Sequence, residues 1–429
     1  MQANDTVLIR PARNILGSLR VPGDKSISHR YAMLAALAPG RSRFENYSPG
    51  ADCNSTLGCV RALGCSVERD EKGAVLIDGL GPELKAPSAP LDCGNSGSTM
   101  RMLSGIVAAQ PFVSVMIGDE SLSRRPMKRV MEPLRKMGAE ITATDDHAPL
   151  HISGAHLKGI DYAVPVASAQ VKTCLLFSGL LAEGQTTVEE PTRTRDHGEL
   201  ALRAFGAQLT RSRNSVTIAG GQSLHPLEVF IPGDSSSAAF FLCAAAIFPG
   251  SNLVIDGVLL NPTRSALLDV LTAMGCKVNM MRVEESHGEL AGTISLTSGI
   301  RKPIEISGAT TALLIDELPV LAAIAPYTAG MLVRDAGELR MKESDRLWAV
   351  TQNLRAMQAE VEQNDDGWKI PGAQKLQGAE IESFGDHRIA MAFAIAALRA
   401  EGHTLIRNSG CVAISYPGFF SDLEAVLER

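Results

Sequence analysis

Two short segments, Val21-Pro22-Gly23-Asp24 and Ile231-Pro232-Gly233-Asp234, decide how this 429-residue chain is organised. Each is followed by an apolar stretch typical of a helix, and these stretches end at Pro39-Gly40 and Pro249-Gly250. Because the same order recurs at the same spacing, the sequence predicts an internal repeat and therefore two similar halves.

The halves define the expected domains. We expect residues 22–231 to form one domain and residues 1–21 together with 232–429 to form the other, with two chain crossings near residues 21 and 232. A length of 429 residues agrees with two or three domains at roughly 150 residues each.

A finer pattern predicts a helix that stops at a glycine and leads directly into a strand, because glycine readily adopts the left-handed conformation that ends helices. Each copy follows an amphipathic stretch. The five copies are residues 61–67, 135–141, 203–209, 272–278 and 355–361, and Gln358 replaces the glycine in the last.

Six other stretches are apolar nearly all round, which predicts buried helices. They are residues 31–37, 100–109, 173–181, 238–247, 313–325 and 389–398. Together the patterns predict an α/β (α+β) protein of six similar units, three in each half, with Pro417–Leu427 as a shortened last helix.

The composition of the chain disfavours some classes of partner and cellular location. The chain has 45% apolar, 21% charged and only 4% aromatic residues and a formal net charge of −6, which disfavours a nucleic-acid or anionic-membrane partner. No apolar run reaches the length of a membrane span, and the first residues lack a signal peptide, so we expect a cytoplasmic protein. The eight cysteines form no C-x-x-C pair and are expected to be reduced.

The segments just before the buried helices are the candidate ligand-binding segments. The first N–H groups of a helix attract anions, and nearby lysines or arginines strengthen such a site. Four of the six segments contain a cation, among them Lys25, Arg30, Arg101 and Lys172, which would oppose the helix dipole unless an anion is bound. Ser, Thr, Asp and Asn there are also ordinary caps, so one segment alone would indicate only capping.

Further basic segments are Arg124-Arg125-Pro126, residues 193–199 and residues 340–346. We expect Lys342, Glu343 and Arg346 to open an amphipathic helix; the alternative for each segment is a solvated helix start. If the helix ends converge, an anionic ligand is expected between the halves.

Metal and nucleotide chemistry have little support. There is no H-E-x-x-H, no G-x-x-x-x-G-K-[ST], and no G-x-G-x-x-G after a strand. The sequence therefore predicts a metal-free chemistry on an anionic ligand and disfavours the nucleotide-binding folds.

These motifs closely resemble the 5-enolpyruvylshikimate-3-phosphate synthase family, and several resemble its class II subgroup. The matching segments are residues 23–26, 94–97, 168–172, 195–199, 261–264, 342–346 and 385–388. The resemblance implies the enolpyruvyl transferase fold, an inverse α/β barrel of two globular domains with three βαβαββ units each, closing on the substrates like a clamp.

The resemblance also implies the reaction: transfer of the enolpyruvyl group of phosphoenolpyruvate to the 5-hydroxyl of shikimate-3-phosphate, with release of phosphate, by addition and elimination. It places the protein in the shikimate pathway to chorismate and the aromatic amino acids. Its partners would be these two small molecules, with no nucleic acid, membrane, metal or cofactor, and we expect a monomer.

By motif match, three groups of residues are implied. Lys25, Asp316 and Glu343 resemble catalytic residues. The phosphoenolpyruvate site would comprise Lys25, Asn95, Gly97, Arg125, Gln170, Arg346 and Arg388. The shikimate-3-phosphate site would comprise Lys25, Ser26, Arg30, Ser168, Ala169 through its backbone, Gln170, Arg195, Asp316 and Lys342.

Three departures from the family pattern matter. Ala169 replaces a serine that would add a phosphate-binding hydroxyl, and Lys172 is expected to compensate. Gly410-Cys411 stands where some members carry a lysine. Gly97 leaves open a space that an alanine fills in some glyphosate-tolerant members, so glyphosate tolerance stays undecided.

Two rival functions share parts of this pattern. A UDP-N-acetylglucosamine enolpyruvyl transferase would share fold and chemistry but uses a loop cysteine, and none of the eight cysteines lies near Arg124-Arg125-Pro126. A catalytically silent sugar-phosphate binding protein would not need Asp316 and Glu343, because binding anions requires no carboxylates.

Overall fold

The computed structural model describes residues 5–300 and 302–429 and shows two compact units. The N-half unit comprises Gly23–Ile231 with the hairpin tip His287–Glu289. The C-half unit comprises the chain up to Pro22, Pro232–Ser286 and Leu290–Arg429. The sequence pattern did not predict that a hairpin tip from the second half would belong to the N-half unit.

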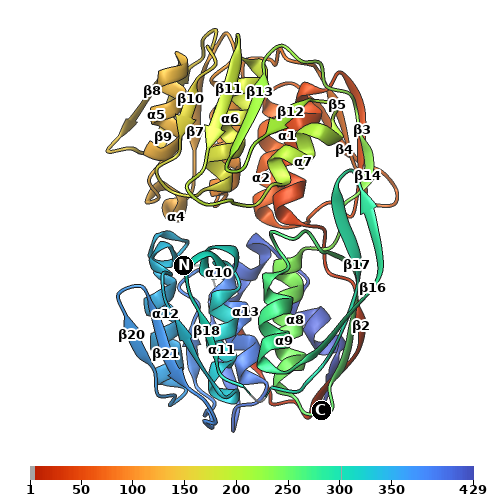
Figure 1. Ribbon diagram of the computed structural model, residues 1–429, viewed down its shortest axis with the longest axis vertical. Coiled ribbons are helices and arrows are strands. Elements are labelled where there is room, and N and C mark those ends of the chain that lie inside the picture. The colour runs from red at the N-terminus through yellow and green to blue at the C-terminus, as the bar shows by residue number, and fades with distance from the viewer. Residues whose placement is uncertain (1–4, 301) are drawn as a thin grey trace. The chain divides into compact units, whose positions relative to one another are not determined.

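Each unit is built from three small sheets around interior helices (Figure 1). In the described residues of the N-half unit the sheets have the orders β14-β3-β5-β4, β6-β7-β9-β8 and β10-β11-β13-β12. Their strands are β3 Gly40–Glu45, β4 Ser66–Arg69, β5 Val75–Gly79, β6 Leu91–Asp92, β7 Val113–Ile117, β8 Glu140–Thr144, β9 His147–Ser153, β10 Asp161–Ala163, β11 Gln185–Glu189, β12 Leu209–Arg211, β13 Ser215–Ala219 and β14 Glu228–Phe230.

The described sheets of the C-half unit have the orders β16-β17-β15-β2-β24, β18-β19-β21-β20 and β1-β23-β22. Their strands are β1 Thr6–Ile9, β2 Asn14–Leu19, β15 Asn252–Leu259, β16 Lys277–Ser286, β17 Glu289–Thr297, β18 Ile304–Ile306, β19 Gly330–Val333, β20 Glu362–Asn364, β21 Gly367–Pro371, β22 Glu380–Glu382, β23 Thr404–Arg407 and β24 Leu427–Glu428.

The same pairing recurs in all six described sheets. One parallel pair, such as β10 with β11 or β18 with β19, is followed by antiparallel pairing of the second strand. In the last sheet β1, from the start of the chain, supplies that antiparallel partner to β23. The predicted α/β fold of six similar units is therefore confirmed.

The buried helices are α1 Lys25–Leu37, α3 Gly97–Val107 and α6 Ala169–Leu181 in the N-half unit, and α8 Ser235–Ile247, α11 Leu318–Ile324 and α13 His387–Ala397 in the C-half unit. The remaining helices are α2 Ala51–Ala62, α4 Glu120–Ser123, α5 Lys128–Met137, α7 His197–Ala204, α9 Ala266–Met274, α10 Gly308–Leu313, α12 Arg346–Ala356 and α14 Phe419–Ala425.

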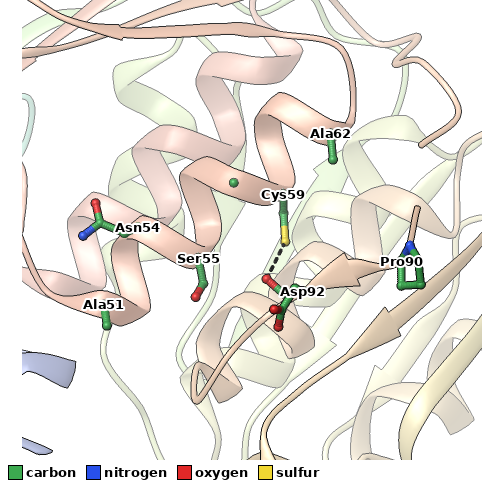
Figure 2. A pocket seen from close by; sticks show the side chains of 8 residues that line it. Ala51, Asn54, Ser55, Cys59, Ala62, Pro90 and Asp92 are labelled. Atoms are coloured by element: carbon green, nitrogen blue, oxygen red, sulfur yellow. Dashed lines mark hydrogen bonds between the residues drawn. The ribbon is translucent and has the colours of Figure 1, made fainter. Parts of the chain in front are cut away.

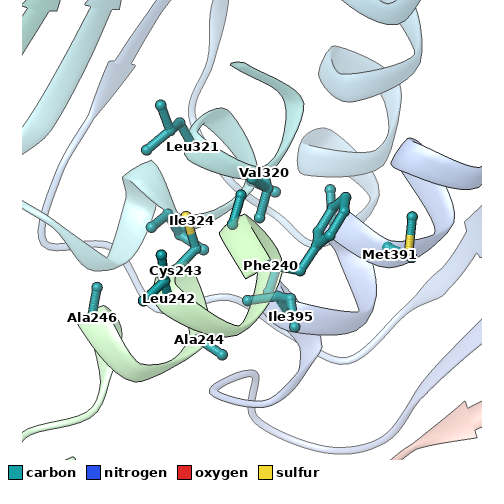
Figure 3. Packing of buried hydrophobic residues seen from close by; sticks show 14 of the residues in the cluster. Phe240, Leu242, Cys243, Ala244, Ala246, Val320, Leu321, Ile324, Met391 and Ile395 are labelled. Carbon is teal, nitrogen blue, oxygen red and sulfur yellow. The ribbon is translucent and has the colours of Figure 1, made fainter. Parts of the chain in front are cut away.

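Apolar packing holds each unit together. In the C-half unit α8, α11 and α13 contact one another, and Phe240, Ile324 and Ile395 meet in the resulting cluster (Figure 3). The sheets alternate buried and exposed side chains, as in β11, so one face covers the helices and the other faces outward.

One predicted helix is wrong in its extent. The apolar stretch 313–325 does not form a single helix, because α10 ends at Leu313, residues 314–317 form a turn, and α11 begins at Leu318. Pro319 lies in the first turn of α11, where its missing N–H costs nothing, whereas inside a longer helix it would remove a hydrogen bond.

The chain crossing at Gly23 leaves no room for a side chain. A Cβ added there would lie 1.7 Å from the carbonyl oxygen of Asn46. On the other side of the crossing, the Asp234 N–H donates to the carbonyl of Pro22 at 2.8 Å. The repeated Pro-Gly-Asp segments are thus explained by close backbone approach.

The helix-stop pattern has the predicted geometry at all five copies. Gly64, Gly138, Gly206 and Gly275 have φ angles of 98°, 113°, 97° and 112°, and Gln358 adopts 64° although it carries a side chain. A left-handed residue with a Cβ costs about 1–2 kcal/mol.

We predict that Gln358→Gly raises the free energy of unfolding by roughly 0.5–1 kcal/mol, because the relieved strain exceeds the extra freedom that glycine gives the unfolded chain. The matched control is Gly138→Ala, where nothing but the His156 carbonyl, at 3.9 Å, lies near the new Cβ. It should lower stability by about 1–2 kcal/mol. Chemical denaturation of both variants checks this, and a destabilised Gln358→Gly would contradict it.

Candidate active site

The N-termini of the buried helices are capped by the residues that the sequence singled out. Side chains of Asp24, Ser96, Ser168, Asp234 and Asp386 accept hydrogen bonds from first-turn N–H groups of α1, α3, α6, α8 and α13. A cap satisfies one or two of the free donors, so the other N–H groups of each first turn still favour an anion.

Lys25 and Arg30 come from the first two turns of α1. The Nζ of Lys25 lies 2.9 Å from Oδ2 of Asp52, and both side chains are largely buried. Arg30 donates to the carbonyl of Ser26 at 2.9 Å and to Oγ1 of Thr173 on α6 at 3.0 Å. Arg30 therefore ties α1 to α6 and fixes the orientation of its own guanidinium.

Burial lowers the pKa of Arg30 to about 10, with Asp24 and Glu199 opposing the shift and the charge of Arg195 adding to it. The guanidinium remains protonated at neutral pH. Because the charge of Arg195 acts on Arg30, these two cations, both predicted to bind shikimate-3-phosphate, belong to one electrostatic cluster.

Gln170 connects the first turn of α6 to α3. Its Oε1 accepts from Arg101 at 2.8 Å, and its Nε2 donates to Oγ of Ser98 at 2.9 Å. Ser168 caps α6 and Ala169 is the first residue of that helix. The sequence identified Arg101 as a cation but not its bond to Gln170, because the two residues lie 69 positions apart.

Asn95, Gly97 and Arg125 meet at the start of α3. Arg125 donates to Oδ1 of Asn95 at 2.9 Å, and a Cβ added to Gly97 would lie 3.4 Å from an Nη1 of both Arg101 and Arg125. Two guanidiniums thus cover Gly97. The alternative of a merely exposed arginine pair is wrong for Arg125, which is buried, although Arg124 is exposed.

Lys172 is not available to compensate for the alanine at position 169. Its fully buried Nζ lies 2.8 Å from Glu190 Oε2 and 2.9 Å from Glu199 Oε1. The expectation that it opposes the dipole of α6 unless an anion binds is therefore wrong, since two protein carboxylates already neutralise it.

In the C-half unit a second cluster surrounds Arg346. Its Nε donates to Asp386 at 2.8 Å, its Nη2 to Glu343 at 2.6 Å, and its Nη1 lies 3.5 Å from Asp316. Burial alone would lower the pKa of Arg346, but these carboxylates raise it above its ordinary value. Burial opposes ionisation of Asp386, yet mainly through Arg346 its pKa is held below the usual range.

Arg388 and Lys342 border the same cluster. Arg388 donates to the carbonyl of Asp316 at 2.9 Å, and its Nη2 lies 3.9 Å from Oδ2 of that residue. The pKa of Lys342 is lowered chiefly by burial; Asp316 opposes this shift and Arg346 adds to it. Asp316, Lys342, Glu343, Arg346 and Arg388 are therefore brought together.

The predicted helix start at residue 342 is wrong. A short 3₁₀ helix, Gly337–Met341, precedes Lys342, and α12 begins only at Arg346, capped by Asp345. Lys342 and Glu343 therefore lie in a loop, whose backbone is freer than a helix to present both side chains to a ligand. Likewise α5 begins at Lys128 and not at Pro126.

The N-half unit also has a groove of about 520 Å³ (Figure 2). It is lined by α2 and the segment around β6, including Ser55, Cys59 and Asp92. None of its lining residues is among the sequence-predicted site residues. We assign the chemistry to the charged clusters, because this groove supplies no cation for an anionic ligand.

The described residues also bear on metal sites and membrane spans. Within residues 5–300 and 302–429, no group of three His, Cys, Asp or Glu side chains is placed to hold a metal ion. Over the same residues, no helix is long and apolar enough to cross a membrane. The eight cysteines, all in the described chain, are free, as the sequence predicted.

Six repeats around interior helices, with cations and carboxylates at the helix starts, define the enolpyruvyl transferase class of fold. The enolpyruvyl transferase NikO from Streptomyces tendae has the same fold, with a TM-score of 0.79 over 99% of this chain and 98% of that one at 19% identity. An EPSP synthase structure from Acinetobacter baumannii is more similar, with a TM-score of 0.88, 40% identity, and 99% and 98% coverage.

The family model for EPSP synthase (3-phosphoshikimate 1-carboxyvinyltransferase) matches residues 9–423. The 3-phosphoshikimate 1-carboxyvinyltransferase of Koribacter versatilis is 60% identical, over 99% of this chain and all of its own length. That of Bacillus subtilis is 46% identical over 96% of this chain and 97% of its own. The chain belongs to the EPSP synthase family, which confirms the resemblance read from the motifs.

We predict that Lys172→Met lowers the free energy of unfolding by about 3–5 kcal/mol, because it leaves two buried carboxylates without their cation. Lys375→Met is the matched control, since Lys375 is exposed and lies 3.7 Å from Glu401. That variant should cost about 0–1 kcal/mol. Denaturant unfolding measures both, and equal costs would refute the role given to the buried triad.

Proposed function

We propose that the charged clusters at the helix starts of both units bind the two substrates of the family reaction and move its protons. Phosphoenolpyruvate would be held by Lys25, Asn95, Gly97, Arg125, Gln170, Arg346 and Arg388. Shikimate-3-phosphate would be held by Lys25, Ser26, Arg30, Ser168, Ala169, Gln170, Arg195, Asp316 and Lys342.

As a 3-phosphoshikimate 1-carboxyvinyltransferase of the shikimate pathway, the enzyme moves the enolpyruvyl group of phosphoenolpyruvate to the 5-hydroxyl of shikimate-3-phosphate and releases phosphate. Both substrates carry a phosphate and a carboxylate. Their hydration must be replaced by fixed donors, and arginine and lysine side chains with helix N–H groups provide donors of that kind.

The observation that carries the proposal is the environment of Arg346. Its side chain is 1% exposed, and its guanidinium contacts Glu343, Asp316 and Asp386, which come from three separate segments. Three carboxylates around one guanidinium, with Arg388 and Lys342 beside them, supply groups for both anion binding and proton transfer.

The reaction needs an acid for the vinyl carbon of phosphoenolpyruvate and a base for the 5-hydroxyl. In the first step the vinyl CH₂ of phosphoenolpyruvate gains a proton. The 5-hydroxyl loses its proton, and its oxygen bonds to the carbon next to the new methyl group. In the second step the C–O bond to phosphate breaks and the methyl group returns a proton. We propose that Glu343 is the acid and that Asp316 is the carboxylate that binds the 5-hydroxyl. Lys25 is a further candidate for either proton transfer.

The hydrogen bond from Arg346 favours the ionised form of Glu343. A phosphoenolpyruvate phosphate bound to Arg346 would compete for that donor and make it easier for Glu343 to take up the proton it must deliver. Binding and acid catalysis are coupled in this way through one guanidinium.

The cellular setting remains part of the proposal. We infer a cytoplasmic enzyme without a membrane or nucleic-acid partner, because the net charge of −6 and the polar substrates favour neither. A monomer is expected as well.

We predict that Glu343→Gln lowers turnover by roughly a hundredfold or more while substrate binding is largely retained, since glutamine keeps the shape but loses the acid. Phosphate release with both substrates measures turnover, and calorimetry measures binding. Glu305→Gln, at an exposed ion pair with Arg334, is the control and should be near normal. Near-normal turnover of Glu343→Gln would remove Glu343 from the mechanism.

A further inference from the structure

Four buried polar side chains form a continuous series of hydrogen bonds inside the N-half unit, which we call the hydroxyl chain. It runs from His29 on α1 through Thr56 on α2 to Thr99 and Ser96 at the start of α3. Each link, from His29 Nδ1 to Thr56 Oγ1, then to Thr99 Oγ1, then to Ser96 Oγ, measures 2.7 Å. All four residues are 0% exposed.

The direction of these bonds follows from the number of protons. A hydroxyl has one proton to donate. Thr99 donates its proton to Ser96, so the bond between Thr56 and Thr99 must be donated by Thr56. Thr56 then has no proton left and must accept from His29. This assigns the imidazole proton to Nδ1 of His29.

The ring is also neutral. The pKa of His29 lies well below its ordinary value, first because of burial and then because of the charges of Lys25 and Arg30. Within the described chain its Nε2 meets no hydrogen-bond partner. In the described residues, the polar contact of the His29 ring is therefore its hydrogen bond into the hydroxyl chain.

We propose that His29 is a positioning residue that sets the spacing between two helix starts through the hydroxyl chain. One is the first turn of α1, which supplies Lys25. The other is the turn that Ser96 caps at α3, which supplies Asn95 and Gly97. This inference rests on the proposed function, in which phosphoenolpyruvate contacts both turns.

The two substrates depend on different links between helices. Lys25 and Gln170 are assigned to both substrates. Asn95 and Gly97, at the start of α3, are assigned to phosphoenolpyruvate alone, and the hydroxyl chain joins this start to α1. The shikimate-3-phosphate residues on α1 and α6 are instead joined by the bond from Arg30 to Thr173. Misplacing a contact by about 1 Å can cost up to a hundredfold in rate, so breaking one link should affect one substrate selectively.

The kinetic test uses Thr56→Val, which removes the central hydroxyl and keeps the side-chain shape. We expect KM for phosphoenolpyruvate to rise about tenfold and KM for shikimate-3-phosphate to change less than twofold. Thr186→Val is the matched control, because this hydroxyl is equally buried and, in the part of the chain described, makes no hydrogen bond. It should leave both constants unchanged.

Thr173→Val provides the reciprocal variant and should raise KM for shikimate-3-phosphate selectively. Thr99→Val breaks the hydroxyl chain at a second point and should give the same selective rise in KM for phosphoenolpyruvate. It replaces Thr56→Val in the test if Thr56→Val folds poorly. If Thr56→Val and Thr99→Val match Thr186→Val, or raise both KM values equally, the positioning role is overturned.

The tautomer is tested without substrates by ¹⁵N NMR of histidine-labelled enzyme, with His29→Gln to assign the signals. We expect a neutral ring protonated at Nδ1 between about pH 6 and 8. Protonation at Nε2 alone, or a charged ring, would overturn the assignment. Absence of phosphate release by the wild-type enzyme with both substrates would instead refute the proposed function and leave the NMR result standing.

Discussion

Interior helices must satisfy the N–H groups of their first turns, and this constraint governs the protein. All six repeated units place an apolar helix inside a layer of short strands, and the N–H groups at its start need partners from side chains, water or a ligand. Five of the six starts use a side-chain cap. The N–H donors that remain, together with nearby cations, favour small anions. Burying the helices thus leaves sites at their starts that can bind phosphate or carboxylate groups.

The cations at these starts differ in how they are neutralised. Lys172 is permanently neutralised by Glu190 and Glu199 and serves stability. Arg346 also contacts carboxylates, and two of these, Glu343 and Asp316, are partly accessible and lie in a loop and a turn. Ion pairs of the second kind can exchange a protein carboxylate for a substrate phosphate, which suits an enzyme whose substrates are both anionic.

Local features could be predicted from the sequence. The repeats, the buried helices and the helix stops follow from periodicity and glycine placement, and even Gln358 keeps the left-handed geometry of the glycine it replaces. The bounds of α11 and α12 were missed, because apolar spacing does not reveal a turn at residues 314–317 or a loop at Lys342.

Long-range pairing could not be predicted. The partners of Lys172, the burial of Arg125 and the hydroxyl chain each depend on segments far apart in sequence, and periodicity reports only local structure. The family motifs supplied the residues of the proposed site, but they did not show that Arg346 contacts three carboxylates or that Arg30 bonds to Thr173.

A crystal structure with bound shikimate-3-phosphate tests the central claim most directly. The account predicts its phosphate at the start of α6, contacting Ser168, the Ala169 N–H and Gln170, with its carboxylate near Ser26 and Arg30. A phosphate bound instead to exposed arginines such as Arg41, away from every helix start, would contradict it.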